Sequence, residues 1–415
     1  MRAEIVGIGT EILLGQIANS NARWMSERLA GIGVDVLHHQ AVGDNVERIG
    51  DAFRLALSRA DVVIATGGLG PTQDDITRDA IGLALDVRLV RHPEIEELLR
   101  EKFRGLGRPM PEINLVQADV PEGARYIVPE RGTAPGLACP AGDGKTLYAV
   151  PGVPAEMREM MEGTILPELA ASAGPATIVS RVVRCTGISE SRVSEIVADL
   201  FHGSTNPTVA YLASSGEVKV RLTAKAPTRE EAEALIRPVE EEVVRRLGPA
   251  VFTTGDEELE AVVGGLLRSA GKTVACAESL TGGSLAARFT AVPGSSDYFF
   301  GSAVCYTKEA KRSVLGVSQR TLDGPGVVSE ECAREMAAGA RRLFGANLAV
   351  SLTGVAGPEP HGGQPPGTVW VAVDAGEAQR ARTFRAPGDR EQVIRWAQQA
   401  ALDMVRRHLE GTLSD

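Results

Sequence analysis

Three glycines followed by two aspartates form the first stretch of the chain that could carry out chemistry. The stretch follows a short apolar run, DVVIAT at 61–66, and reads Gly67-Gly68-Leu69-Gly70-Pro71-Thr72-Gln73-Asp74-Asp75. The apolar run predicts a buried strand, and a helix is expected to begin just after the aspartates. Glycines let a backbone approach an anion closely, and free N–H groups at a helix start favour phosphate. Because no lysine of the Walker type is present, the stretch is not a P-loop.

The two aspartates predict a metal, because Asp74 and Asp75 would repel a bare phosphate. A divalent cation such as Mg²⁺ would remove this conflict by bridging carboxylate and phosphate oxygens. The alternative is a glycine turn followed by acidic residues at a helix start, which the helix dipole also favours. Asp44, three residues before Glu47, is expected to cap another helix rather than to bind a ligand.

A second group of candidates lies in the last third of the chain. Ser279 follows a strand-like run and precedes Thr281-Gly282-Gly283, where a helix is expected to begin, so this turn also predicts a geometry that accepts phosphate. Ser296, Tyr306 and Lys311 follow. A serine attacks only when a nearby base removes its proton; with no histidine in this neighbourhood, a lysine with a lowered pKa or a tyrosine polarised by lysine is the expected base. The alternative is that these are ordinary surface or capping residues.

The composition favours an enzyme that acts on small molecules. Only seven of the 44 basic residues are lysines, so a lysine retained here indicates a need for an amine that can titrate. The net charge of -10 argues against a general nucleic-acid or membrane surface. Five widely spaced cysteines predict neither a disulfide framework nor a zinc site. No apolar run approaches the roughly 20 residues that cross a bilayer, and the chain does not begin like a signal peptide, so a cytoplasmic location is expected.

Alternating strand-like and helix-like segments must position these residues. The first segments include a strand at 4–9 and a helix that Pro93 opens and Gly105 ends, a pattern typical of a parallel sheet covered by helices. Small and turn-forming residues at 171–180 break this pattern. A compact α+β segment follows, and near residue 250 an α/β pattern begins again. Because 415 residues exceed the size of one hydrophobic core, the length predicts two or three domains. With these breaks we expect three, at 1–170, 171–250 and 251–415.

Individual elements are predicted in the second and third of these domains. In the middle domain, strands are expected at 178–185 and 217–224, and helices at 189–201 and 228–247. In the last domain, strands are expected within 273–279, 301–307, 347–354 and 367–373, together with a helix at 329–344.

Three strings near the N-terminus carry a family resemblance. GTE…LLGQ…N at 9–19, TGGLGPT-x-DD-x-T at 66–77 and VPGVP-x-EM at 150–157 resemble the amino-terminal domain of the CinA family, which is similar to molybdopterin-binding proteins. In that family the domain is associated with metal-dependent hydrolysis of ADP-ribose to AMP and ribose 5-phosphate. The resemblance makes Asp74 and Asp75 candidates for metal binding or water activation. It implies substrate contacts at Gly9, Thr10, Glu11, Asn19, Gly67, Gly68, Gly70 and Thr72.

The last third carries a second resemblance. AES-x-TGG at 277–283, GSS…Y-x-x-x-x-K at 294–311, TGVAGP at 353–358 and PGTVW at 366–370 resemble the carboxy-terminal CinA domain, also found alone as nicotinamide mononucleotide deamidase. This implies hydrolysis of the carboxamide to nicotinate mononucleotide and ammonia, without a cofactor. Leu280 stands where many relatives carry cysteine, which argues against a thiol nucleophile there.

The second resemblance implies residue roles. Ser296 is expected to be the nucleophile and Ser279 the second candidate, with Tyr306 and Lys311 as the proton-transfer pair. His361, in a Gly/Pro-rich loop, is expected at a mobile surface. Contacts with phosphate and ribose are expected from Thr281, Gly282, Gly283, Thr353, Gly357 and Arg390.

Together the two resemblances imply a bifunctional α/β hydrolase of pyridine-nucleotide salvage. Its expected parts are a molybdopterin-binding-like parallel-sheet domain, a KH-like α+β linker domain and an α/β deamidase domain. The linker carries Gly187-Ile188-Ser189-Glu190 in place of the Gly-x-x-Gly loop of nucleic-acid-binding KH domains, so a spacer role is expected. Two alternatives stay open: an N-terminal domain that binds a nucleotide or pterin without hydrolysing it, and an adaptor in competence or DNA damage. Homo-oligomer formation also stays open.

Overall fold

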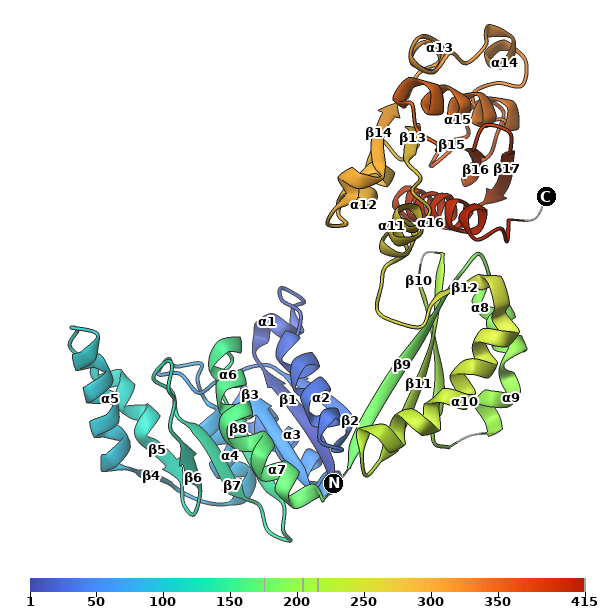
Figure 1. Ribbon diagram of the computed structural model, residues 1–415. Helices are drawn as coiled ribbons and strands as arrows, with labels where there is room; N and C mark the ends of the chain where they lie inside the picture. The colour runs from blue at the N-terminus through green and yellow to red at the C-terminus, as the bar shows by residue number, and fades with distance from the viewer. Residues whose placement is uncertain (175, 204, 215, 414–415) are drawn as a thin grey trace. The chain divides into compact units, whose positions relative to one another are not determined.

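The computed structural model in Figure 1 describes residues 1–174, 176–203, 205–214 and 216–413. Pro175, within the break expected at 171–180, lies outside the described residues. The chain divides into two compact units, Met1–Val179 with Ala224–Leu235, and Ser180–Thr223 with Ile236–Asp415. Within the described ranges, no helix is long and apolar enough to cross a membrane.

A six-stranded mixed sheet forms the centre of the first unit. Its first four strands are parallel, and the last two are antiparallel additions that the sequence did not predict. In spatial order the strands are β2 (Asp35–Val42), β1 (Arg2–Ile8), β3 (Val62–Thr66), β8 (Thr146–Val150), β7 (Gly136–Pro140) and β6 (Arg125–Ile127).

Helices cover both faces of this sheet, because successive strand residues point to opposite faces. Ile8 and Val63 pack into one core with Phe53, whereas Ile5 and Ile64 pack into the other core with the methionines of α2 and α6. The helices of the unit are α1 (Thr10–Leu13), α2 (Ser20–Gly31), α3 (Val46–Arg59), α4 (Thr77–Leu85), α5 (Pro93–Gly105), α6 (Pro154–Met160) and α7 (Leu166–Ala173). A small separate sheet pairs β4 (Leu89–Arg91) with β5 (Asp119–Pro121).

The cap of α3 differs from the predicted one. Asn45, and not Asp44, accepts a hydrogen bond at 3.0 Å from the backbone N–H of Arg48. Asp44 instead accepts from the backbone N–H of Thr10 at 3.0 Å and from its hydroxyl at 2.7 Å. The expectation that Asp44 is a helix cap is therefore wrong.

The middle of the chain forms a four-stranded sheet with helices. In spatial order its strands are β10 (Thr208–Ser214), β11 (Glu217–Ala226), β9 (Thr177–Thr186) and β12 (Val251–Thr253). The helix expected at 189–201 is interrupted, because Val197 leaves helical geometry with φ -115° and ψ 17°. The helices here are α8 (Glu190–Ile196), α9 (Ala198–Gly203) and α10 (Arg229–Leu247).

A second mixed sheet carries the C-terminal part. Its strands, in spatial order, are β14 (Phe299–Val304), β13 (Val274–Glu278), β15 (Leu348–Gly354), β16 (Thr368–Asp374) and β17 (Gln379–Arg385). The first three are parallel and the last two antiparallel. As Figure 1 shows, α15 covers one face, and α11 and α16 cover the other. The helices are α11 (Leu259–Ser269), α12 (Ser284–Thr290), α13 (Lys308–Leu315), α14 (Gln319–Asp323), α15 (Glu330–Phe344) and α16 (Arg390–Leu409).

Candidate active sites

The N-terminal candidate is a pocket of about 480 Å³ at the carboxyl ends of β1, β3 and β8. Ligands of open α/β sheets bind at such strand ends. Seven of the predicted residues line it: Gly9, Glu11, Gly67, Gly68, Gly70, Asp74 and Asp75. Asp44 and Glu156 also line it, and neither was predicted as a ligand.

Three other residues that were predicted to contact the substrate do not line this pocket. They form hydrogen bonds with neighbouring parts of the chain instead. Thr10 binds the Asp44 carboxylate, and Thr72 donates from its backbone N–H at 2.8 Å and its hydroxyl at 2.5 Å to Asp75. Asn19 caps α2 by accepting from the backbone N–H of Ala22 at 3.0 Å. These residues position carboxylates and a helix.

Contacts with neighbouring residues hold the glycine loop, residues 67–70, in one conformation. Gly67 has φ +111°, and a Cβ there would lie 2.3 Å from the carbonyl oxygen of Ile8, so only glycine fits. The hydroxyl of Thr77 donates to the Gly67 carbonyl at 2.8 Å. The buried Arg78 donates to the carbonyls of Leu69 at 2.5 Å and Gly70 at 3.3 Å, and burial lowers its pKa to about 10. The loop is therefore a preformed part of the pocket.

The acidic residues of this pocket supply the hard oxygen donors that Mg²⁺ prefers. No three histidine, cysteine or acidic side chains converge as a metal cage among the residues that the structure describes. Mg²⁺ commonly binds one or two carboxylates together with substrate phosphates and water, and Asp74 and Asp75 fit that pattern. Burial raises the pKa of Glu156, and the neighbouring Glu159 carboxylate adds to this.

The C-terminal candidate is a pocket of about 320 Å³ at the carboxyl ends of β13, β14 and β15. The structure brings six predicted residues together here: Ser279, Tyr306, Lys311, Thr353, Gly357 and Arg390. Leu280 and His361 line the pocket too, and His361 is exposed, as expected of a surface residue. Thr353 uses its hydroxyl to donate to the carbonyl of Val327 at 2.6 Å.

Ser279 and Lys311 are in direct contact in this pocket. The Nζ of Lys311 lies 2.8 Å from the Oγ of Ser279 and donates to the carbonyl of Cys305 at 2.7 Å. Lys311 is buried in the first turn of α13, which Thr307 caps. No carboxylate among the described residues pairs with Lys311 in a salt bridge, and burial lowers the pKa of its amine. A buried amine of lowered pKa can be neutral, and a neutral amine can accept a proton.

Tyr306 and Arg390 occupy the mouth of the same pocket. Arg390 donates to the Tyr306 hydroxyl and to the Gly357 carbonyl, each at 3.0 Å. The side chain of Tyr306 is 60% exposed. Its hydrogen-bond partner is thus Arg390, whereas that of Lys311 is Ser279. The arrangement places a cation at the entrance and a hydroxyl–amine pair inside.

Comparisons with known proteins identify the family. Residues 4–171 match the "Probable molybdopterin binding domain", residues 180–253 the "Damage-inducible protein CinA KH domain", and residues 256–409 the "CinA C-terminal domain". A CinA-like protein of Frankia casuarinae is 46% identical and covers 99% of this chain and 97% of its own length. One of Dictyoglomus thermophilum is 42% identical and covers 99% of each. The chain belongs to the CinA family.

Membership of the CinA family confirms the expected resemblance and the multidomain α/β fold. The crystal structure of the protein CinA with unknown function from Thermoplasma acidophilum is 34% identical, covers 40% of this chain and 95% of its own, and has a TM-score of 0.38. The names of these relatives state no reaction.

Ser296 lies away from the other predicted catalytic residues of this CinA chain. It is exposed in the short turn Ser295–Asp297, just before β14, whereas Tyr306 and Lys311 come after β14. The strand has six residues with a rise of about 3.3 Å from one to the next, so its ends are roughly 17 Å apart. The expectation that Lys311 and Tyr306 serve Ser296 therefore fails, because the strand separates them.

The predicted phosphate turn holds a carboxylate of the chain itself. The buried Glu278 accepts from the backbone N–H groups of Gly283 and Leu285 at 3.0 Å and of Ala286 at 2.9 Å, and from the Ser302 hydroxyl at 2.9 Å. Its negative charge thus occupies the start of α12. The remaining predicted contacts, Thr281, Gly282 and Gly283, do not line the pocket. A strand–turn–helix pattern reveals an anion site, and it does not reveal which anion fills it.

Proposed function

We propose that the C-terminal pocket hydrolyses the carboxamide of nicotinamide mononucleotide to nicotinate mononucleotide and ammonia. The observation that carries this proposal is the 2.8 Å contact between the Ser279 hydroxyl and the buried Lys311 amine. Amide hydrolysis needs a nucleophile and a base for its proton, and this pair can supply both. Ser279 replaces Ser296 as our choice of nucleophile.

In the proposed reaction, Lys311 starts as a neutral amine. It accepts the Ser279 proton while Oγ bonds to the carboxamide carbon and the carbonyl electrons move to oxygen. Collapse of this intermediate breaks the C–N bond, and Lys311 returns the proton to the leaving ammonia. Water then attacks the resulting ester with the same amine as base, which restores Ser279 and releases the carboxylate. No metal or other cofactor takes part.

The pocket entrance supports binding of the phosphate. Arg390 already makes charge-assisted hydrogen bonds there, and its guanidinium can take a phosphate oxygen in addition. Tyr306 orients this guanidinium, so we assign Tyr306 a positioning role.

We further propose that the N-terminal pocket hydrolyses ADP-ribose to AMP and ribose 5-phosphate. The fixed glycine loop would contact the pyrophosphate, and Asp74 and Asp75 would hold a divalent cation. When bound, that cation supplies Lewis-acid and water-activating chemistry. The alternative is binding of a nucleotide or pterin without hydrolysis. Incubation of the protein with ADP-ribose and Mg²⁺ separates the two, because a binding module releases no AMP.

The biological setting follows from these activities. We propose that the protein acts on small nucleotides in the cytoplasm, with the middle domain as a spacer. The sequence supports the spacer role, because Gly187-Ile188-Ser189-Glu190 stands in place of a Gly-x-x-Gly loop. An adaptor in competence would instead retain its function in variants that lack both activities.

The serines of the C-terminal part provide a matched test. Ser279→Ala should abolish ammonia release from nicotinamide mononucleotide, whereas Ser296→Ala should leave it unchanged. Normal turnover of Ser279→Ala would refute the mechanism, and loss of activity in Ser296→Ala alone would restore the first expectation.

A further inference from the structure

Two turns that lead from a strand into a helix differ in whether their backbone N–H groups are free. In the turn between β13 and α12, Glu278 accepts three backbone N–H groups, so a carboxylate of the chain fills that anion site. In the glycine loop after β3, the N–H groups of Gly68, Leu69 and Gly70 have no acceptor among the residues that the structure describes. The glycine loop therefore keeps donors for an anion from outside the chain.

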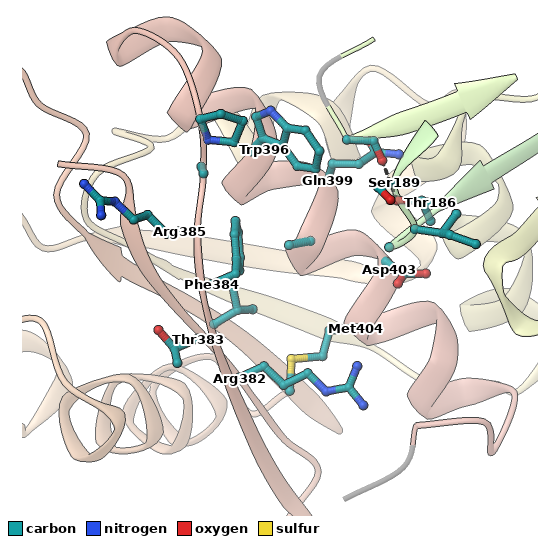
Figure 2. Close-up of a pocket in the computed structure, with 17 residues that line it drawn as sticks. Thr186, Ser189, Arg382, Thr383, Phe384, Arg385, Trp396, Gln399, Asp403 and Met404 are labelled. Atoms are coloured by element: carbon teal, nitrogen blue, oxygen red, sulfur yellow. Dashed lines mark hydrogen bonds between the residues drawn. The ribbon is translucent and has the colours of Figure 1, made fainter. Parts of the chain in front are cut away.

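The pocket shown in Figure 2 is of another kind. It has a volume of about 390 Å³, lies within the second unit and is used by neither proposed activity. Its walls are mostly apolar and include Phe384 from β17 and Trp396 from α16. The acidic Asp403 in its lining is paired with Arg406 at 2.6 Å and with Arg407 at 2.8 Å. Such walls suit apolar groups, so a phosphate is expected at the glycine loop instead.

Thr77 determines where the first N–H groups of the glycine loop point. Its hydroxyl donates to the Gly67 carbonyl at 2.8 Å, and its backbone N–H donates to the Gly68 carbonyl at 3.1 Å. A trans peptide unit is planar and directs its C=O and its N–H to opposite sides. The N–H groups of Gly68 and Leu69 therefore point away from Thr77.

Arg78 does the same for the next peptide unit. Its guanidinium donates to the Leu69 carbonyl at 2.5 Å and to the Gly70 carbonyl at 3.3 Å, so the N–H of Gly70 points away from Arg78. Since the loop lines the N-terminal pocket, its three free N–H groups form a concave donor surface there. Successive N–H groups in this arrangement bind anions.

The burial of Arg78 also favours an anion on the other side of the loop. Arg78 is only 3% exposed and forms no salt bridge with any residue in the described part of the chain. Its Nε has no hydrogen-bond partner among these residues either. A buried cation without a paired carboxylate is costly. A phosphate bound to the loop would offset this cost, because charges attract strongly where water is excluded.

We propose that Thr77 and Arg78 are positioning residues of the N-terminal reaction. They hold the N–H groups of the glycine loop so that these bind one phosphate group of the pyrophosphate, and this contact does not need the metal. The inference rests on the proposed hydrolysis of ADP-ribose for the identity of the ligand. The donor surface itself follows from the hydrogen bonds of Thr77 and Arg78.

Calorimetric titration of the full-length chain with ADP-ribose in EDTA tests this proposal. Thr77→Val keeps the shape of the side chain but removes the donor, and it should weaken binding about tenfold. Thr77→Ser keeps the hydroxyl and should bind like the unaltered chain. Arg78→Met removes two hydrogen bonds and the charge, and it should weaken binding at least as much as Thr77→Val. Arg88→Met is the matched control, because Arg88 is exposed, pairs with Glu122 and does not line the pocket.

Urea unfolding checks that Arg78→Met is folded, and the Thr77 variants decide the proposal where it is not. Unchanged binding by Thr77→Val would overturn the proposal. Equal weakening in Thr77→Ser and Thr77→Val would do the same, because it would assign Thr77 a packing role. Failure of the unaltered chain to bind in EDTA would mean that the metal holds the phosphate. If Thr77→Val alone weakens binding but the unaltered chain releases no AMP with Mg²⁺, the anion site stands and the proposed hydrolysis is refuted.

Discussion

Lys311 Nζ lies 2.8 Å from Ser279 Oγ although the two residues are 32 positions apart in the chain. The two parallel strands β13 and β14 create this contact, because both end at the same edge of the sheet. Ser279 follows the first strand, and Lys311 lies in the helix after the second. Burial keeps water away from the amine, and this makes its proton affinity the decisive property of the site.

Replacing Lys311 by arginine should separate proton transfer from charge. Lys311→Arg keeps a cation that cannot titrate near neutrality, so kcat for deamidation should fall about a hundredfold or more. Steady-state ammonia release measures this. If Lys311 only binds phosphate, KM will rise and kcat will stay nearly intact. Lys308→Arg, three residues earlier on the exposed side of α13, is the matched control and should behave like the unaltered chain.

The lowered pKa of Lys311 predicts a pH-dependent stability. In the unfolded chain the amine titrates near 10.5, and in the folded chain it titrates at a lower value. Between these two values the unfolded state binds more protons, so the free energy of unfolding rises with pH. Lys311→Met removes this dependence. Relative to the variant, the unaltered chain should therefore gain stability as the pH approaches 10.5.

Urea unfolding of both proteins at several pH values between 7 and 10 tests this expectation. The hydrogen bonds that Lys311→Met removes shift all points together, so only the slope of the difference matters. A constant difference across this range would show that burial does not lower the pKa of the amine.

The sequence revealed strands and turns better than it revealed which residues meet. The apolar runs at β3, β13 and β15 predicted buried strands, because their side chains are apolar on both faces. β17 was missed, since its sequence QRARTFR is polar and its strand forms through seven residue pairs with β16. The two strands form a hairpin through the turn at 375–378, so Gly376 in that turn was the local signal that sequence reasoning missed.

The candidate sites show the same division. The family resemblance singled out Ser279, Tyr306 and Lys311, and the structure brings them to one pocket. The same resemblance favoured Ser296, although this residue precedes the strand expected within 301–307 and Lys311 follows it, so the order of residues along the chain already indicated their separation. Glu278 was visible in the sequence, but its role depends on N–H groups that only the folded turn directs toward it.

Glu278→Gln should destabilise the C-terminal part of the chain. The carboxylate accepts four hydrogen bonds in a buried position, and an amide group would turn its own donor toward some of these N–H groups. Leaving buried donors unsatisfied costs about 1–3 kcal/mol each, so we expect a loss of about 2 kcal/mol or more in urea unfolding. Glu391→Gln, at an exposed ion pair with Arg395, should cost less than about 0.5 kcal/mol. Similar losses in both variants would contradict the structural role of Glu278.

Asp74 and Asp75 provide the last prediction, which concerns the N-terminal pocket. The double variant Asp74→Asn, Asp75→Asn keeps the size of both side chains but removes the charge that would hold a cation. AMP release from ADP-ribose should fall below detection, whereas calorimetry should still detect ADP-ribose binding, because the glycine loop is fixed by Arg78 and Thr77. Asp79→Asn, an exposed change in α4 outside the pocket, should keep full activity. Full hydrolysis by the double variant in the presence of a chelator would exclude metal dependence. Loss of binding as well would mean that the two carboxylates maintain the loop itself.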